Sequence, residues 1–98
     1  MKKILLLGAG KIGAIISELL ATTGDYEVHV ADRDQASLEG LPQHAAVKPL
    51  LLDVTDSNAL HSAMQGKFAA LSALPFDFTR FVAEAAVASG VHYLDLTE

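Results

Sequence analysis

The 98-residue chain contains no cysteine, which excludes disulfide bonds, thiolate chemistry and a cysteine-ligated zinc site. No apolar stretch reaches the roughly 18 residues that a transmembrane helix requires. A short apolar run near the N-terminus leads directly into a glycine-rich turn, so we expect no secretory signal peptide. These absences predict a cytoplasmic protein without a membrane partner.

Basic clusters are also missing, and the formal net charge is −5, so we expect no nucleic-acid partner. The 4 histidines lie on separate predicted elements without His-x-x-x-His spacing, and we predict no metal site. Hydrophobic residues make up 51% of the chain and charged residues 19%. This composition is typical of one globular domain with a substantial core.

The N-terminal stretch carries the strongest motif. An apolar run over residues 4–7 ends at Gly8, and a Gly-x-Gly-x-x-Gly sequence follows to Gly13. In this motif Gly8 permits a sharp turn, Gly10 lets a pyrophosphate approach the main chain, and Gly13 allows close packing of helix on strand. Apolar residues then recur at the spacing of a helix, at Ile12, Ile15, Ile16, Leu19 and Leu20. The stretch therefore predicts strand, tight turn and helix.

The same motif also occurs as a strand-to-helix turn without a ligand, so its context matters. A second apolar strand, residues 26–31, ends at Asp32. Asp32 follows Gly13 at about the 20-residue distance expected for the acid that binds the adenosine ribose. Backbone N–H groups near Lys11 and Ile12 would face the phosphates at the positive end of the helix dipole. This context favours a dinucleotide-binding site.

Strand and helix patterns alternate along the rest of the chain. Asp34 is a suitable N-cap for a short helix, and Asp56 or Ser57 can cap the next one. Pro49 places the third strand near a sheet edge or at a strand start. On the last helix, Phe81, Val82, Ala85 and Ala86 are expected to face inward. The predicted strands are 4–7, 26–31, 47–52, 68–74 and 91–96, and the predicted helices are 11–22, 35–39, 58–65 and 78–88. Repeated β-α units favour a three-layer α/β fold with a doubly wound parallel sheet of about five strands in the order 3-2-1-4-5.

Ligands of such sheets bind beyond the carboxyl ends of the strands, where the strand order reverses. Four segments converge there. The candidate cofactor-binding residues are Gly8, Ala9, Gly10, Lys11, Ile12, Gly13, Asp32, Arg33, Asp53, Val54, Ala73, Leu74 and Pro75. Asp53 either accepts a hydrogen bond from the adenine amino group or caps the turn after its strand.

The choice of cofactor depends on two adjacent residues. The Asp32 carboxylate can accept from ribose hydroxyls and would repel a 2′-phosphate, which predicts NAD rather than NADP. Arg33 can stack on the adenine or reach a 2′-phosphate, so NADP stays open as the alternative.

A complete catalytic apparatus is missing from the sequence, and no catalytic residue is assigned. Tyr93 and Asp95 share one face of the last predicted strand, where they either border a substrate site or are buried with hydrogen bonds. A hydride-transfer enzyme also needs a second region that holds the substrate against the nicotinamide. We therefore expect residues 1–98 to be the N-terminal cofactor domain of a longer enzyme.

Six segments together resemble the N-terminal NAD(P)-binding Rossmann domain of the saccharopine dehydrogenase family. They are residues 3–13, Val-Ala-Asp-Arg-Asp at 30–34, Leu-Asp-Val-Thr-Asp at 52–56, residues 73–76, residues 85–88 and the closing Gly-Val-His-Tyr-Leu-Asp-Leu-Thr at 90–97. The resemblance covers essentially the whole chain, and its closing segment is the specific part. Ser72 departs from the asparagine expected at its position.

The resemblance implies an NAD(P)-dependent oxidoreductase that transfers hydride at the C–N bond of an amino-acid-derived secondary amine. It also implies a small amino-acid-type substrate held by a C-terminal domain, an inactive isolated fragment and a possible homodimer of the full-length protein. The alternative is a regulatory NAD-binding module of a potassium-transport system. Such modules begin with the same strand, motif and helix but usually carry Gly-Asp where this chain has Leu52-Asp53.

Overall fold

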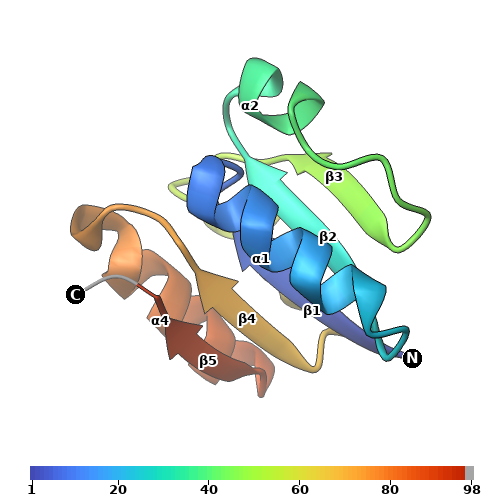
Figure 1. Ribbon diagram of the computed structural model, residues 1–98. Coiled ribbons are helices and arrows are strands. Elements are labelled where there is room, and N and C mark those ends of the chain that lie inside the picture. Colours follow the sequence, from blue (N-terminus) through green and yellow to red (C-terminus); the bar gives the residue numbers. More distant parts are fainter. Residues whose placement is uncertain (97–98) are drawn as a thin grey trace.

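Strands and helices alternate along the chain in the computed structural model, which describes residues 1–96 (Figure 1). The elements are β1 (Lys2–Leu7), α1 (Lys11–Thr22), β2 (Tyr26–Asp32), α2 (Gln35–Glu39), β3 (Val47–Leu51), α3 (Ser57–Met64), β4 (Ala69–Ser72), the 3₁₀ turn η1 (Phe76–Phe78), α4 (Thr79–Ser89) and β5 (His92–Asp95). Every predicted strand and helix is present, with ends that differ by a few residues. Thr97, the last residue of the closing motif, lies outside the described residues.

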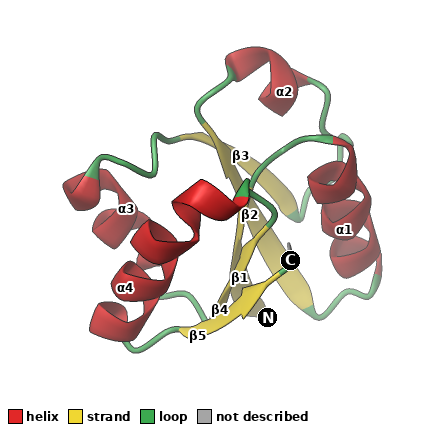
Figure 2. Cartoon of the chain, turned by 90° about the vertical axis from the view of Figure 1, so that its left-hand side faces the viewer, coloured by secondary structure: helices red, strands yellow, loops and turns green. Residues whose placement is uncertain are grey.

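The five strands form one parallel sheet in the order β3-β2-β1-β4-β5. Helices α1 and α2 lie on one face of the sheet, and α3 and α4 lie on the other (Figure 2). The predicted three-layer, doubly wound fold is therefore confirmed. Strand order reverses at β1, whose carboxyl end lies between those of β2 and β4, because Leu7 is in register with both Ala31 and Ser72.

The central strand β1 is buried on both faces of the sheet. Leu5 and Leu7 pack with Leu60 of α3 and Val82 of α4, while Leu6 packs on the α1 side. Full burial of each such side chain contributes about 1.5–3 kcal/mol to folding. The buried apolar strand β1 thus fixes the position of the glycine-rich turn that follows it.

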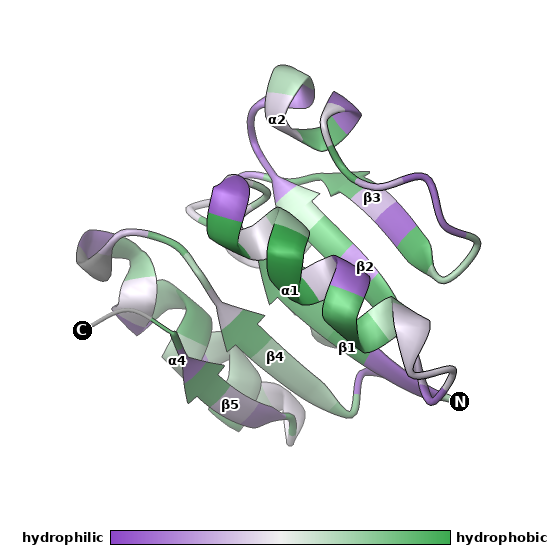
Figure 3. Cartoon of the chain, in the orientation of Figure 1, coloured by the Kyte–Doolittle hydropathy of each residue, from purple (hydrophilic) through white to green (hydrophobic). Residues whose placement is uncertain are grey.

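Helix α1 turns an unexpected face toward the sheet. Its buried residues are the small Gly13, Ser17 and Ala21, which follow one another at four-residue spacing. The large side chains of Ile12, Ile15 and Leu19 are 62%, 59% and 63% exposed, and Figure 3 shows hydrophobic residues along this helix. Ile16 and Leu20 are half-buried and pack against the core on this side. The apolar spacing therefore predicted the helix correctly but marks its buried side only in part.

Several local predictions are confirmed by hydrogen bonds. Asp34 caps α2 by accepting from the Ala36 N–H at 3.0 Å, and Asp56 caps α3 by accepting from the Ala59 N–H at 3.2 Å. Pro49 lies on β3, which is an edge strand. Edge pairing tolerates proline because one side of the strand has no neighbour to receive an N–H donor.

Two details of the second half differ from the prediction. The fourth strand ends at Ser72 rather than at residue 74, because the chain leaves the sheet before Pro75, which has no N–H to donate. Phe81 was predicted to face inward with Val82, yet it is 40% exposed. The buried residues of α4 are Val82, Ala85 and Ala86, and Phe81 lies at the edge of the groove between α3 and α4.

Within residues 1–96, no helix combines the length and the apolar character needed to cross a membrane.

Candidate functional site

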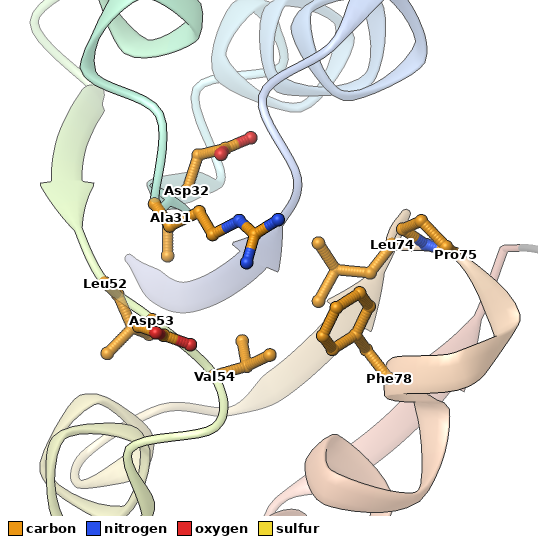
Figure 4. Close-up of a pocket in the computed structure, with 9 residues that line it drawn as sticks. Ala31, Asp32, Leu52, Asp53, Val54, Leu74, Pro75 and Phe78 are labelled. Atoms are coloured by element: carbon orange, nitrogen blue, oxygen red, sulfur yellow. The ribbon is translucent and has the colours of Figure 1, made fainter.

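A pocket of about 190 Å³ opens at the carboxyl ends of the strands. It brings together six predicted site residues, namely Asp32, Arg33, Asp53, Val54, Leu74 and Pro75. Ala31, Leu52 and Phe78 also line it (Figure 4). The pocket lies at the point where the strand order reverses, as expected for a doubly wound sheet.

The structure needs glycine at two of the three motif positions beside this pocket, and for different reasons. Gly8 has a φ of 108°, and a Cβ there would lie 3.1 Å from the Ala73 carbonyl oxygen. A Cβ on Gly13 would overlap the carbonyl oxygen of Gly8. Gly10 has an ordinary φ of −67°, and a Cβ there would meet no atom within 4 Å. The fold thus requires glycine at positions 8 and 13, whereas it leaves open space at position 10.

The N-terminus of α1 begins at this open space. Gly10 is the N-cap and supplies no side-chain hydrogen bond, and the first turn carries no acidic residue. The N–H groups of a first helical turn have no partner within the helix. Those near Lys11 and Ile12, together with the positive end of the helix dipole, therefore form an arrangement suited to a phosphate group.

Asp32 reaches from the end of β2 to the glycine-rich loop. Its Oδ2 accepts from the Ala9 N–H at 2.9 Å, and its Oδ1 accepts from the Asp34 N–H at 2.9 Å. Gly8 also donates its N–H to the Ala31 carbonyl oxygen at 2.8 Å. The predicted acid and the predicted loop are thus in direct contact. Ala9 is 5% exposed, so its side chain packs inside the loop and does not line the surface of the site.

Asp53 lies exposed at the end of the third strand. Its Oδ1 accepts from both the N–H and the hydroxyl of Thr55, at 2.9 and 2.7 Å. The Thr55 hydroxyl, the Thr55 N–H and then the Arg33 charge lower the pKa of Asp53 below its ordinary value. The turn-capping role predicted as one alternative is therefore present. Oδ2 takes no part in these two bonds, so it remains an acceptor for a further donor.

The other side of the pocket is apolar. Figure 4 shows Val54 facing Leu74 and Phe78 across it. Phe78 and Leu74 also pack against the core beneath α3 and α4. Sequence reasoning missed Phe78 because its apolar spacing assigned it to the start of a helix. Its position three residues after Pro75 is the signal that places it at the carboxyl edge.

Tyr93 and Asp95 lie near the same edge, on β5. Asp95 accepts from the Thr79 hydroxyl at 3.0 Å. Burial raises the pKa of Tyr93 above its ordinary value, and the Asp95 charge raises it further. Ser72 is fully buried, and its Oγ accepts from the Leu74 N–H at 3.4 Å. Tyr93 is half-buried, and its hydroxyl is enclosed without a hydrogen-bond partner among the described residues, whereas Asp95 is exposed. The alternative in which both side chains are buried with hydrogen bonds is therefore not met.

Metal-binding groups do not gather near this site: in the described part of the chain, no three histidine, aspartate or glutamate side chains come close enough together to hold an ion.

A sequence model of the family described as saccharopine dehydrogenase NADP binding domain matches residues 4–98. The chain belongs to this family. A relative, saccharopine dehydrogenase [NADP(+), L-glutamate-forming] of Saccharomyces cerevisiae, is 33% identical over 86 residues, which are 88% of this chain and 19% of the relative. The resemblance predicted from the sequence is therefore confirmed.

Solved structures support the same family and fold. Apo histidine-tagged saccharopine dehydrogenase (L-Glu forming) from Saccharomyces cerevisiae superposes with a TM-score of 0.91 at 28% identity, over 100% of this chain and 22% of that one. A Rossmann-fold NAD(P)-binding family protein from Shigella flexneri superposes with a TM-score of 0.83 at 25% identity, over 95% of this chain and 50% of that one. This chain spans about a fifth of the saccharopine dehydrogenase that it matches.

These matches support a nicotinamide dinucleotide as the cofactor. The family description names NADP, so it does not support the predicted preference for NAD. The matches also do not favour the alternative of a regulatory module from a potassium-transport system.

Proposed function

We propose that this chain binds the dinucleotide of an NAD(P)-dependent oxidoreductase, with the pyrophosphate over Gly10 at the N-terminus of α1. The observation that carries the proposal is the space at Gly10. Its φ of −67° suits any residue, and no atom lies within 4 Å of the position of a Cβ. Neither conformation nor packing requires glycine there, and glycine keeps this space free for the close approach of a phosphate.

The pocket suits the adenosine half of the cofactor. Val54 lies opposite Leu74 and Phe78 (Figure 4), and these apolar walls fit the faces of an adenine ring. Asp53 Oδ2 would accept from the adenine amino group, and Asp32 would accept from the ribose hydroxyls. The main chain of residues 72–75 would pass under the pyrophosphate and the nicotinamide-side ribose.

Asp32 and Arg33 set the choice between NAD and NADP. The Asp32 carboxylate accepts two backbone N–H groups and lines the pocket at the end of β2. A 2′-phosphate would bring close to two further negative charges to this carboxylate. We therefore propose that NAD binds more tightly than NADP. Arg33 is exposed beside the pocket, and tighter NADP binding would mean that its charge outweighs that of Asp32.

We further propose that the complete enzyme oxidises or forms a C–N bond in an amino-acid-derived secondary amine. The bound cofactor would accept or supply the hydride at the carbon next to the nitrogen. Family membership supports this reaction class. The substrate would be held by a region outside residues 1–98, and we expect the isolated chain to bind cofactor without catalysing turnover.

Replacing Gly10 with valine tests the site. The 98-residue chain, Gly10→Val and Ala88→Val would be titrated calorimetrically with NAD and NADP. Ala88 lies exposed on α4, so its variant adds the same branched side chain away from the site. We expect Gly10→Val to lose binding and keep its fold, and Ala88→Val to bind normally. Normal binding by Gly10→Val would place the phosphates elsewhere, and saccharopine oxidation by the isolated chain would contradict the need for a further region.

A further inference from the structure

The Asp32 carboxylate connects three segments of the site. Its Oδ2 accepts from the Ala9 N–H inside the glycine-rich loop, and its Oδ1 accepts from the Asp34 N–H in the turn before α2. Both bonds are 2.9 Å long. In Figure 4 the carboxylate points away from Val54 and Phe78, out of the apolar part of the pocket. The turn before α2 thus orients the carboxylate, and the carboxylate holds the loop.

The contact with Ala9 matters because that residue is buried. Ala9 is 5% exposed, and a buried backbone N–H needs a partner. The Ala9 N–H comes directly before Gly10, over which we place the pyrophosphate. Without the carboxylate, the loop would gain by turning this N–H toward water. That rotation would change the path of the main chain at Gly10.

We infer that Asp32 is a positioning residue for the phosphate-binding loop, in addition to its contact with the ribose. This inference rests on the proposed function for the location of the site. Each carboxylate oxygen accepts more than one hydrogen bond, so the backbone contacts leave Asp32 able to accept from a ribose hydroxyl. The consequence is that Asp32 contributes to the binding of ligands that have no ribose hydroxyls at all.

A pair of nucleotides separates the two roles. ADP carries both ribose hydroxyls, and 2′,3′-dideoxy-ADP carries neither. Both would be titrated by NMR against the unaltered chain, Asp32→Ala and Asp34→Ala. Asp34→Ala is the matched control, because it removes the cap of α2 and keeps the N–H that Asp32 accepts. We expect Asp32→Ala to lower the affinity for dideoxy-ADP about tenfold, the usual effect of losing one such hydrogen bond. Asp34→Ala should leave the affinity for dideoxy-ADP unchanged.

The inference would be overturned if Asp32→Ala bound dideoxy-ADP as tightly as the unaltered chain but bound ADP more weakly. Asp32 would then be a ribose contact only. Failure of the unaltered chain to bind ADP or NAD would instead overturn the proposed function. The two failures are therefore distinguishable.

Hydrogen exchange tests the loop contact without any ligand. We expect the Ala9 amide to exchange at least about tenfold faster in Asp32→Ala than in the unaltered chain or in Asp34→Ala, because its acceptor is gone. Asp32→Asn keeps one acceptor oxygen and serves if Asp32→Ala fails to fold. If both variants fold, the Ala9 amide should exchange more slowly in Asp32→Asn than in Asp32→Ala. If only Asp32→Asn folds, its Ala9 amide should exchange faster than that of the unaltered chain. An Ala9 amide that stays equally protected in every folded variant would overturn the inference.

Discussion

A single methyl group has opposite consequences at two glycines of the same loop. At Gly13 the added carbon would overlap the carbonyl oxygen of Gly8, which is backbone and cannot rotate away. At Gly10 the same carbon would meet no atom within 4 Å. The motif therefore combines a residue that the fold needs with a residue whose space is free for a ligand.

We predict that Gly13→Ala lowers the free energy of unfolding by about 3 kcal/mol, since α1 must move away from β1. Gly10→Ala should cost at most about 1 kcal/mol, because alanine is a somewhat poorer N-cap than glycine. Urea denaturation of the two variants and the unaltered chain measures both values. Equal losses would contradict the close packing of Gly13 on Gly8.

Asp53 and Thr55 give a prediction about pH. The Thr55 hydroxyl and N–H lower the pKa of Asp53 below its ordinary value of 3.8. In the unfolded chain Asp53 has its ordinary pKa, so between the two pKa values the unfolded state binds more protons. The stabilisation from this pair is therefore complete above pH 3.8 and is lost as the pH falls through the folded-state value.

We expect the stability difference between the unaltered chain and Thr55→Ala to be constant near neutral pH and to shrink below about pH 4. Thr22→Ala is the control, because Thr22 donates to the Leu19 carbonyl oxygen and not to a carboxylate. Its stability difference should not change over the same range. Chemical denaturation at several pH values measures both, and a Thr55→Ala difference that grows toward low pH would contradict the assigned sign.

At the scale of secondary-structure elements, the local sequence pattern determines where helices are capped, whereas contacts between distant residues determine which helix face is buried. Asp34 and Asp56 cap their helices as predicted, because a side chain of this type satisfies the first free N–H groups locally. The buried face of α1 was predictable only in part, because Ile16 and Leu20 pack against the core whereas the other large apolar residues of the helix are exposed. It is set by the contact of Gly13 with Gly8, which turns Ser17 and Ala21 toward the sheet.

The exposed flank of α1 makes this rotation testable. We predict that Ile15→Gln changes the free energy of unfolding by no more than about 0.5 kcal/mol, as is usual for a surface position. Ala21→Gln on the buried face should cost about 2–3 kcal/mol, because a larger polar side chain enters a packed contact. Ile15 is 59% exposed and Ala21 is 2% exposed. Urea denaturation of the pair measures the difference, and a larger loss for Ile15→Gln would contradict the observed face.

At the scale of the whole molecule, topology explains why much of the candidate site was predictable. Reversal of strand order at β1 brings the ends of β2, β3 and β4 together, so residues at those ends meet in one pocket. Asp32, Asp53 and Leu74 were predicted in this way and line it. Phe78 is the last residue of the 3₁₀ turn η1 after β4, and it packs against the core beneath α3 and α4, which periodicity does not predict.

A ligand bound at this point touches several strands and should stabilise the whole domain. By mass action, NAD at 100 times its dissociation constant adds about 2.7 kcal/mol to the free energy of unfolding. For a domain of this size, we predict a rise in Tm of about 10–20 °C. Calorimetry with and without NAD measures the shift. NADP at the same concentration should give a smaller rise in Tm if Asp32 sets the preference.

Without ligand, Gly10→Val should have a Tm close to that of the unaltered chain. Its Tm should not rise with NAD, because the valine side chain fills the space left for the pyrophosphate. An undiminished shift in Gly10→Val would mean that NAD stabilises the domain from another site.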